Sequence, residues 1–237
     1  WWNFGTGALG DMGCHLIDIP FKALGLKYPT DVECSIGTIF TKMWSADYYP
    51  EGCPPSSSVS LHFDATEKNK SPIQMTWSDG GIKPFHPDLL PADVSIEDNG
   101  VIMIGEKGVI TCDSYGNDPK LYLKGEPVIK GERVRVSEPE FGHQRLWVDA
   151  CKAGFNSEEH KSLTSSFDYS GPLTETVLMG NIAIRSYNLE EKKEGSRRSS
   201  YIGRKKLLWD GDNMKIKNLE AANQFVTRDY REGWELT

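Results

Sequence analysis

The feature that most constrains the fold is an alternation of apolar and polar residues in the first third of the chain. Apolar side chains occupy every second position of two runs, namely Val59, Leu61 and Phe63, and then Ile73, Met75 and Trp77. Successive side chains of an extended strand point to opposite faces of a sheet, so this period indicates two half-buried strands. The chain is therefore predicted to build a sheet that buries one of its faces.

The same reasoning predicts further strands. They are expected within residues 32–40, where Val32, Cys34, Ile36 and Phe40 would share a face, and within residues 101–104, 109–112, 121–123, 134–136 and 205–209. The sequence Gly-Glu-Lys-Gly at 105–108 joins two of these strands and predicts a hairpin. Short links between successive strands favour antiparallel pairing.

Apolar residues at helical spacing predict the helices. We expect a helix over residues 11–24 that is kinked by Pro20, and further helices over 143–153, 172–187 and 219–225. In the helix over 172–187, one face is shared by Leu173, Val177, Gly180 and Ile184. These helices are expected to cover one face of the sheet.

The predicted fold class is α+β: one domain over residues 1–237 with a large, mainly antiparallel open sheet and helices packed on one face. Residues 190–206 are polar and charged, and we expect them to form an exposed loop or hairpin tip. The uncovered face of the sheet would either stay polar or be buried against another subunit. Because aromatic residues are frequent in the strands, we expect a homo-oligomer formed through this face.

Composition argues against several function classes. The net charge of -7 comes from charges of both signs along the whole chain, so no basic patch for a nucleic acid is predicted. The sequence has no run of about 18 apolar residues, so no membrane-spanning helix is expected. The 5 cysteines are scattered and lack the spacing of a metal site, so we predict free or buried thiols and no metal.

The N-terminal residues indicate a boundary inside a longer protein. The chain opens with Trp1-Trp2-Asn3-Phe4 and not with Met, and its two tryptophans would be costly to leave exposed. A targeting signal would lie upstream of Trp1, so the sequence predicts a soluble protein without fixing its compartment. Both a cytoplasmic protein and one exported after folding, for example to the periplasm, agree with it.

A glycine-rich run precedes the first predicted helix. Gly5-Thr6-Gly7-Ala8-Leu9-Gly10 matches the G-x-G-x-x-G pattern that holds the pyrophosphate of a dinucleotide. That function requires a buried strand directly before the run and an acidic residue at the end of the next strand. Here only residues 1–4 precede the run, and the next strand ends with Thr41-Lys42-Met43. We therefore interpret the run as a tight turn that leads into the helix.

Two ionisable residues of this helix are candidates for chemistry. Asp11 and His15 are four positions apart, which places their side chains on one face about 5–6 Å apart at Cβ. Asp18 follows three residues later on the same side. A carboxylate beside an imidazole can orient the ring and leave its other nitrogen free to take a proton from a substrate hydroxyl. A helix N-cap at Asp11 and a packing role for His15 are the structural alternatives.

The segment around these residues resembles the Gly-rich Asp-x-x-x-His motif of the glucose-fructose oxidoreductase / inositol dehydrogenase family (Gfo/Idh/MocA). It covers residues 2–18, Trp-Asn-Phe-Gly-Thr-Gly-Ala-Leu-Gly-Asp-Met-Gly-Cys-His-Leu-Ile-Asp. The resemblance continues at residues 77–84, 169–175, 180–183 and 208–210, and residues 230–234 are similar to members of a bacterial subgroup. In that family the motif opens the C-terminal domain.

The resemblance implies a nicotinamide-dependent oxidoreductase that acts on a sugar or polyol. NAD or NADP would be bound by an N-terminal Rossmann domain, and the α+β half would bind substrate and build oligomers. His15 would be the acid/base for the substrate hydroxyl and Asp11 its positioning partner. The family's catalytic Lys, from a Glu-Lys-Pro motif, belongs to the Rossmann half, so this chain is expected to be inactive alone.

Further residues are candidates for substrate binding. They are Trp2, Asn3, Asp18, Lys83 and His86. An aromatic ring suits the face of a sugar, and amide or charged groups suit its hydroxyls. Two alternative functions stay open, namely an NAD-dependent glycosidase of the same family and a non-catalytic module for sugar binding and oligomerisation.

Overall fold

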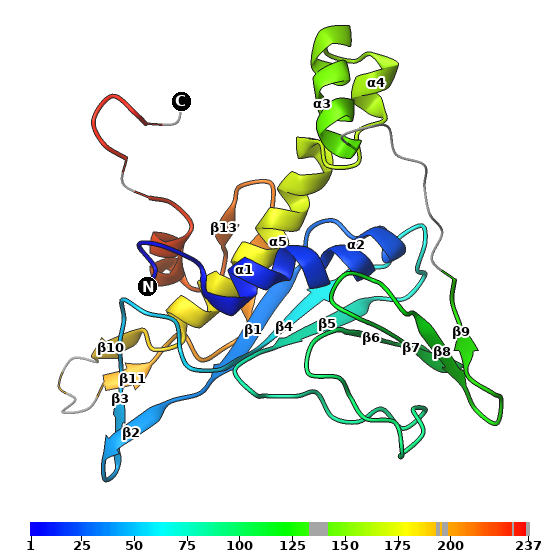
Figure 1. Cartoon of the computed structure of the whole chain (residues 1–237). Helices are drawn as coiled ribbons and strands as arrows, with labels where there is room; N and C mark the ends of the chain where they lie inside the picture. Colours follow the sequence, from blue (N-terminus) through cyan, green and yellow to red (C-terminus); the bar gives the residue numbers. More distant parts are fainter. Residues whose placement is uncertain (133–141, 193–194, 196–198, 229, 236–237) are drawn as a thin grey trace.

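The computed structural model describes residues 1–132, 142–192, 195, 199–228 and 230–235 (Figure 1). Helices and antiparallel sheets occur together in it, and every strand pair in these described ranges is antiparallel. The predicted α+β class is therefore confirmed. Residues 134–136, which were predicted to form a strand, lie outside the described residues.

A five-stranded sheet forms the centre of the fold, in the order β13-β12-β1-β4-β5. Its strands are β1 (Asp31–Ile36), β4 (Ser57–Phe63), β5 (Ile73–Ser78), β12 (Leu207–Asp210) and β13 (Lys215–Ile216). Alternate residues of β4 are buried, as the period-two pattern predicted, and Val59 and Leu61 are fully enclosed. The chain therefore buries one face of this sheet.

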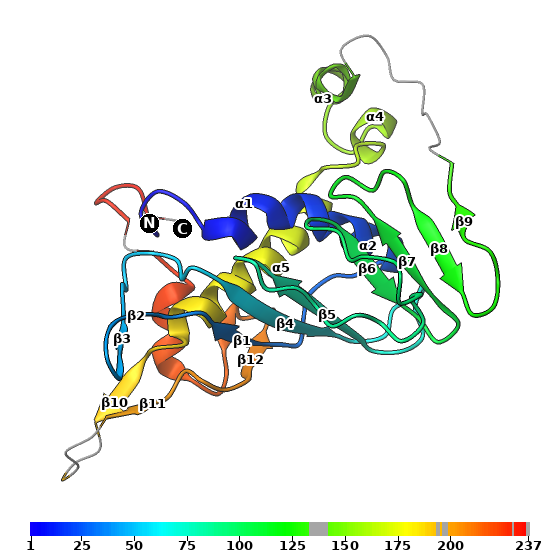
Figure 2. The same ribbon diagram turned by 60° about the horizontal axis from the view of Figure 1, so that its bottom comes forward.

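Helices cover that buried face. They are α1 (Gly7–Leu16), α2 (Asp18–Leu24), α5 (Phe167–Ser186) and the 3₁₀ helix η1 (Glu220–Phe225). Both α1 and η1 pack on α5, which itself packs on β1 and β4, so helices and sheet form layers (Figures 1 and 2). The predicted helix over 11–24 starts earlier than expected and breaks at Ile17, so that Pro20 falls in the first turn of α2, where no backbone N–H is needed.

Glycines allow α1 and α5 to approach closely. A Cβ atom added to Gly180 of α5 would lie 2.3 Å from Leu9 Cδ2, and one added to Gly13 of α1 would lie 3.3 Å from both methyl carbons of Val177. Leu9 is buried in this interface, with 1% of its surface exposed. The buried face predicted for α5 is confirmed, since Leu173, Val177, Gly180 and Ile184 all lie in it.

The remaining long strands form a second sheet, in the order β6-β7-β8-β9. Its strands are β6 (Val101–Ile104), β7 (Gly108–Cys112), β8 (Lys120–Leu123) and β9 (Ile129–Lys130). The predicted hairpin is confirmed, because Val101 pairs with Cys112 and Ile104 with Val109. Hydrogen bonding thus divides the described strands among several sheets and does not join them in a single large one.

Two short hairpins extend from the body. The pair β10 (Glu190–Lys192) and β11 (Ser199–Tyr201) is antiparallel and exposed, and it lies within residues 190–206. The pair β2 (Ile39–Lys42) and β3 (Ser45–Asp47) contradicts the prediction of one strand over 32–40. The strand ends at Ile36, and Phe40 is 60% exposed on the hairpin and not buried beside Val32.

A helical arm contains α3 (Gly142–Ala153) and α4 (Glu158–Lys161). The predicted helix over 143–153 is confirmed, but its expected place over the sheet is wrong, because α3 packs on α4 and projects away from the sheet (Figure 1). Trp147 of α3 is 63% exposed. The apolar side of α3 therefore does not pack on the five-stranded sheet.

The uncovered face of the five-stranded sheet is polar. Side chains of the outward positions on its central strands are Glu33, Ser58, Ser60, His62, Gln74 and Thr76. This face is therefore polar, which is one of the two expectations for it. Burial of the face in a homo-oligomer stays a prediction. None of the described helices has the length and apolar character needed to cross a membrane.

Candidate functional site

The exposed face of α1 carries the two residues of the Asp-x-x-x-His motif. Leu9, Gly13 and Ile17 turn toward the core, whereas Asp11, Cys14 and His15 are exposed on the opposite side. Apolar residues at helical spacing form the face of α1 that packs on α5. The polar residues occupy the other positions and therefore face away from α5. Asp11 and His15 therefore share an accessible surface, separated by one helical turn.

Neither side chain is engaged by the rest of the chain through a polar bond. Within the described residues no hydrogen bond or ion pair holds the Asp11 carboxylate or the His15 imidazole, and the two do not bond to each other. The structural alternative of Asp11 as a helix N-cap does not apply, because α1 begins at Gly7 and its N-cap residue is Thr6. Both groups are free to engage a ligand.

Tyr115 is a residue of this surface that the sequence analysis missed. Its ring lies edge-on to the imidazole of His15, with centroids 5.4 Å apart and the planes inclined by 66°. The turn between β7 and β8 carries it, and the Asp113 carboxylate fixes that turn by accepting the backbone N–H groups of Tyr115 at 2.8 Å and Asn117 at 2.7 Å. The Asp-Ser-Tyr-Gly-Asn sequence signals a turn, but no local pattern indicates that it contacts α1.

Asp18 has a partner inside the fold. Its carboxylate accepts a hydrogen bond from the hydroxyl of Tyr169, whose ring packs edge-on against Phe21. Burial raises the pKa of the Tyr169 hydroxyl, and the hydrogen bond and charge of Asp18 raise it further. The predicted substrate ligand Asp18 thus ties α2 to α5, and its carboxylate is not presented beside His15.

Trp2 and Asn3 lie at the opposite end of α1 from His15. Since a helix rises 1.5 Å per residue, the start of α1 at Gly7 is about 12 Å from His15 along the axis. Trp2 is half-buried and donates its backbone N–H to the Glu51 carbonyl at 2.8 Å. Asn3 is exposed. The structure therefore does not bring these two candidates together with His15.

Lys83 and His86 are bound within their own loop, which links β5 to β6. The Lys83 ammonium contacts the Asp98 carboxylate at 2.7 Å and the Ile96 carbonyl at 3.2 Å. His86 Nε2 lies 3.0 Å from the Val94 carbonyl, which makes it the donor. Both side chains thus stabilise a long loop, and neither extends to the surface of α1.

Side chains of the protein itself occupy the space beside the glycines at the start of α1. Residues 1–6 form turns and no strand, and the strand after α2, β1, belongs to an antiparallel sheet. A Cβ atom on Gly10 would lie 1.7 Å from Thr6 Oγ1, and one on Gly7 would lie 2.5 Å from Cys53 Sγ. Dinucleotide binding by this motif requires a parallel β-α-β unit. The run therefore does not fit a dinucleotide. Its interpretation as a tight turn is wrong, because the turn lies at residues 2–4 and Gly7 to Gly10 already belong to α1.

The described residues also contain no group of three His, Cys, Asp or Glu side chains placed to hold a metal ion. Neither the models of known protein families nor the curated protein sequences give a match to this chain.

Proposed function

We propose that this chain is the substrate-side domain of a nicotinamide-dependent sugar or polyol oxidoreductase, with His15 as its acid/base. The proposal rests on the resemblance of residues 2–18 to the Asp-x-x-x-His motif. One observation carries it further: Asp11 and His15 are exposed on the same face of α1 and have no polar partner among the described residues. An exposed pair of this kind is accessible to a substrate, which proton transfer requires.

The proposed chemistry of His15 is transfer of the substrate hydroxyl proton. A neutral imidazole nitrogen accepts that proton when the alcohol becomes a carbonyl, and the imidazolium returns it in the reverse direction. The Asp11 carboxylate lies one helical turn away on the same face of α1. The ring of Tyr115 packs against the imidazole and restricts its orientation.

The nicotinamide is assigned to a Rossmann domain outside this chain. The run of residues 5–10 is filled by the side chains of Thr6 and Cys53 and does not fit a pyrophosphate. The described residues therefore explain the proton transfer to and from the substrate hydroxyl, and the hydride transfer is left to the other domain. The chain is expected to need that second domain for turnover.

A second candidate function has an observation in its favour. Asp11 and His15 are not hydrogen-bonded to each other, so the catalytic pair is not assembled within the chain itself. A non-catalytic module for sugar binding and oligomerisation would need no such bond. The NAD-dependent glycosidase, by contrast, would use the same cofactor and differ in its products.

Turnover by the intact protein tests the proposal. The substrates are a panel of sugars and polyols with NAD⁺ or NADP⁺, and the readout is absorbance of the reduced nicotinamide. We expect H15A to lower kcat by about 10²–10⁴-fold at an unchanged melting temperature. His143, an exposed histidine of α3, supplies the matched control H143A, which should keep full activity. Undiminished turnover by H15A removes His15 from the mechanism, and absence of turnover in the wild type favours the non-catalytic module.

A further inference from the structure

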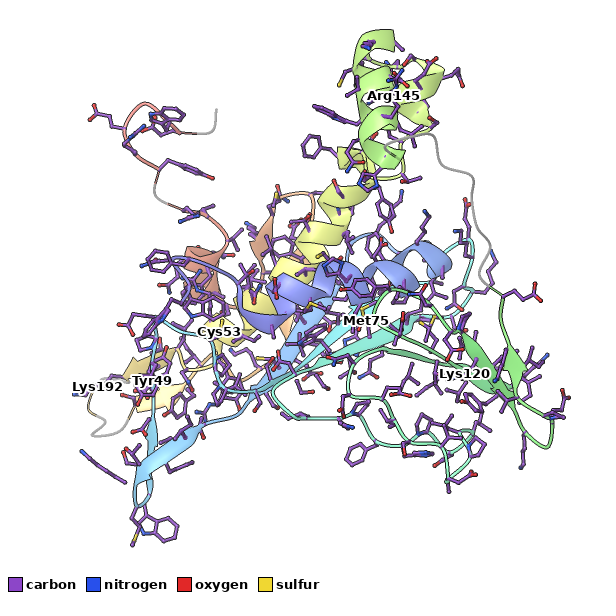
Figure 3. All side chains as sticks on the ribbon, viewed as in Figure 1. Tyr49, Cys53, Met75, Lys120, Arg145 and Lys192 are labelled. Carbon is purple, nitrogen blue, oxygen red and sulfur yellow. The ribbon has the colours of Figure 1, made fainter. Side chains whose placement is uncertain are left out.

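A cavity lies at the end of the fold opposite His15. It encloses about 60 Å³ between the N-terminal segment, the loop after β3 and the C-terminal end of α5. Its lining includes Trp2, Tyr48, Cys53, Arg185 and Asn188. Figure 3 shows Cys53 beside the start of α1, and Tyr49, also of the lining, nearer to the β10–β11 hairpin. The space is sufficient for several water molecules or for one compact polar group.

Arg185 is the cation of this cavity. Its guanidinium carbon lies 4.4 Å from the ring centroid of Phe225 and 5.4 Å from that of Trp2. Contact with aromatic rings leaves the N–H groups at the edge of a guanidinium available. Yet among the described residues Arg185 makes no hydrogen bond and no ion pair. A partly buried guanidinium without an anionic partner is uncommon, because its desolvation is not compensated.

Carboxylates lie around the cavity, because the charges of Glu51 and Glu190 act on Tyr48 of its lining, but none of the described ones forms an ion pair with Arg185. Burial lowers the pKa of Arg185, the neighbouring Arg228 lowers it further, and only the Cys53 thiol opposes them. Asp47, a carboxylate of the cavity lining, already accepts hydrogen bonds from the backbone N–H and the hydroxyl of Thr41, at 3.1 and 3.0 Å. The Arg185 guanidinium therefore has no described carboxylate as a direct partner.

Further polar groups at this end of α5 are available to a ligand. The Asn188 side-chain oxygen accepts from Arg204 at 3.0 Å, which leaves its amide N–H groups as donors on the cavity lining.

We propose that this cavity binds an oxyanion group, a carboxylate or a phosphate, which the edge of the Arg185 guanidinium recognises with support from the Asn188 amide. A guanidinium presents parallel N–H donors that match two oxygens of either anion. The site is separate from the surface of Asp11 and His15 and does not depend on the proposed oxidoreductase function. Its ligand is a small anionic metabolite or the anionic group of a larger one.

Calorimetric titration of the purified protein with sodium phosphate and with sodium acetate, each at constant ionic strength set by sodium chloride, tests the proposal. We expect saturable binding of at least one anion, and the anion that binds identifies its class. R185Q should weaken this binding at least tenfold. R185K retains the charge but not the fork of donors and should weaken it severalfold. K217Q removes an exposed cation elsewhere and should leave it unchanged.

Cysteine labelling places the bound anion. Cys53 lines the cavity, and Cys151 is an exposed free thiol on α3. The binding anion should slow maleimide labelling of Cys53, measured by mass spectrometry, and leave that of Cys151 unaltered. The proposal is overturned by absence of saturable binding of both anions, by equal binding in R185K and wild type, or by binding that leaves Cys53 unprotected. The R185K comparison remains decisive if R185Q does not fold.

Discussion

The phenol ring of Tyr115 lies edge-on to the imidazole of His15, and the two residues are 100 positions apart in the sequence. The contact joins the turn after β7 to the exposed face of α1. An edge-to-face pair of this kind contributes about 0.5–1.5 kcal/mol. The second sheet therefore takes part in orienting the proposed acid/base, although it supplies no group that exchanges a proton with the substrate.

Substitution of Tyr115 should reduce turnover and lower stability by no more than about 1.5 kcal/mol, the upper limit for such a ring pair. Y115A should lower kcat of the intact protein by up to about tenfold, the rate equivalent of about 1.4 kcal/mol, because the imidazole of His15 loses the contact that orients it. Y115F keeps the ring and should retain full activity. Steady-state kinetics and thermal melts check both variants. Equal activity of Y115A and wild type would show that the contact does not position His15.

The contact between α1 and α5 predicts different effects for two glycines of α5. A Cβ atom on Gly180 would lie 2.3 Å from Leu9 Cδ2 and 3.3 Å from Val59 Cγ1, whereas one on Gly171 would meet no atom within 4 Å outside its chain neighbours. G180A should therefore lower the free energy of unfolding by about 1–3 kcal/mol through overpacking. G171A should lower it less, because only the following Pro172, which disfavours a helical alanine before it, opposes the gain in helix propensity. Denaturant unfolding measures both, and equal effects would contradict the close approach of the helices.

Replacing Glu175 with glutamine should stabilise the fold, and the gain should depend on pH. Burial raises the pKa of its carboxyl above the ordinary 4.5, although the hydrogen bond from Trp209 Nε1, 2.5 Å long, opposes the shift. The folded state therefore binds the proton more tightly than the unfolded state, and stability falls as pH rises from 4.5 through the folded-state pKa. E175Q keeps an oxygen for Trp209 and should escape this loss.

The gain from E175Q should stay below about 1 kcal/mol, because solvent screens a partly exposed group. It should be absent at pH 4 and fully developed at pH 7. Urea unfolding at the two pH values measures it, with the exposed Glu126→Gln as the control that shows no such difference. A larger gain at pH 4 than at pH 7 would reverse the sign and refute the argument.

Nicotinamide cofactors should not bind to this chain alone. The side chains of Thr6 and Cys53 fill the space beside Gly10 and Gly7 of the glycine-rich run. No strand precedes the run in the described residues. Titration of NAD⁺ or NADH, followed by calorimetry, should give no saturable heat. Stoichiometric, tight binding would overturn the assignment of the cofactor to a separate domain.

The sequence predicted those elements whose pattern is set locally. The alternation around Val59 and the helical spacing from Leu173 to Ile184 record burial directly, so β4 and the inner face of α5 were correct. The shared face of Asp11 and His15 is likewise a property of any helix through both residues. Phe40 was assigned wrongly because its alternation with Ile36 continues across Gly37, where the chain leaves the sheet.

Long-range contacts could not be predicted from the sequence. Nothing near Asp18, Lys83 or His86 indicates that Tyr169, Asp98 or the Val94 carbonyl would bind them. The direction of α3 away from the sheet depends on segments distant from it, and so does the position of Tyr115. Local periodicity states that a side chain is buried or exposed, but the fold decides which neighbour it meets.

The absence of side chains at Gly13 and Gly180 has a consequence for motion at the proposed site. Leu9 and Val177 occupy the space that these residues leave, so interlocked side chains oppose sliding of α1 along α5. We therefore expect the helix that carries His15 to stay in place when a ligand binds. Any closure around a bound sugar would have to be made by the parts that approach α1 from the solvent side.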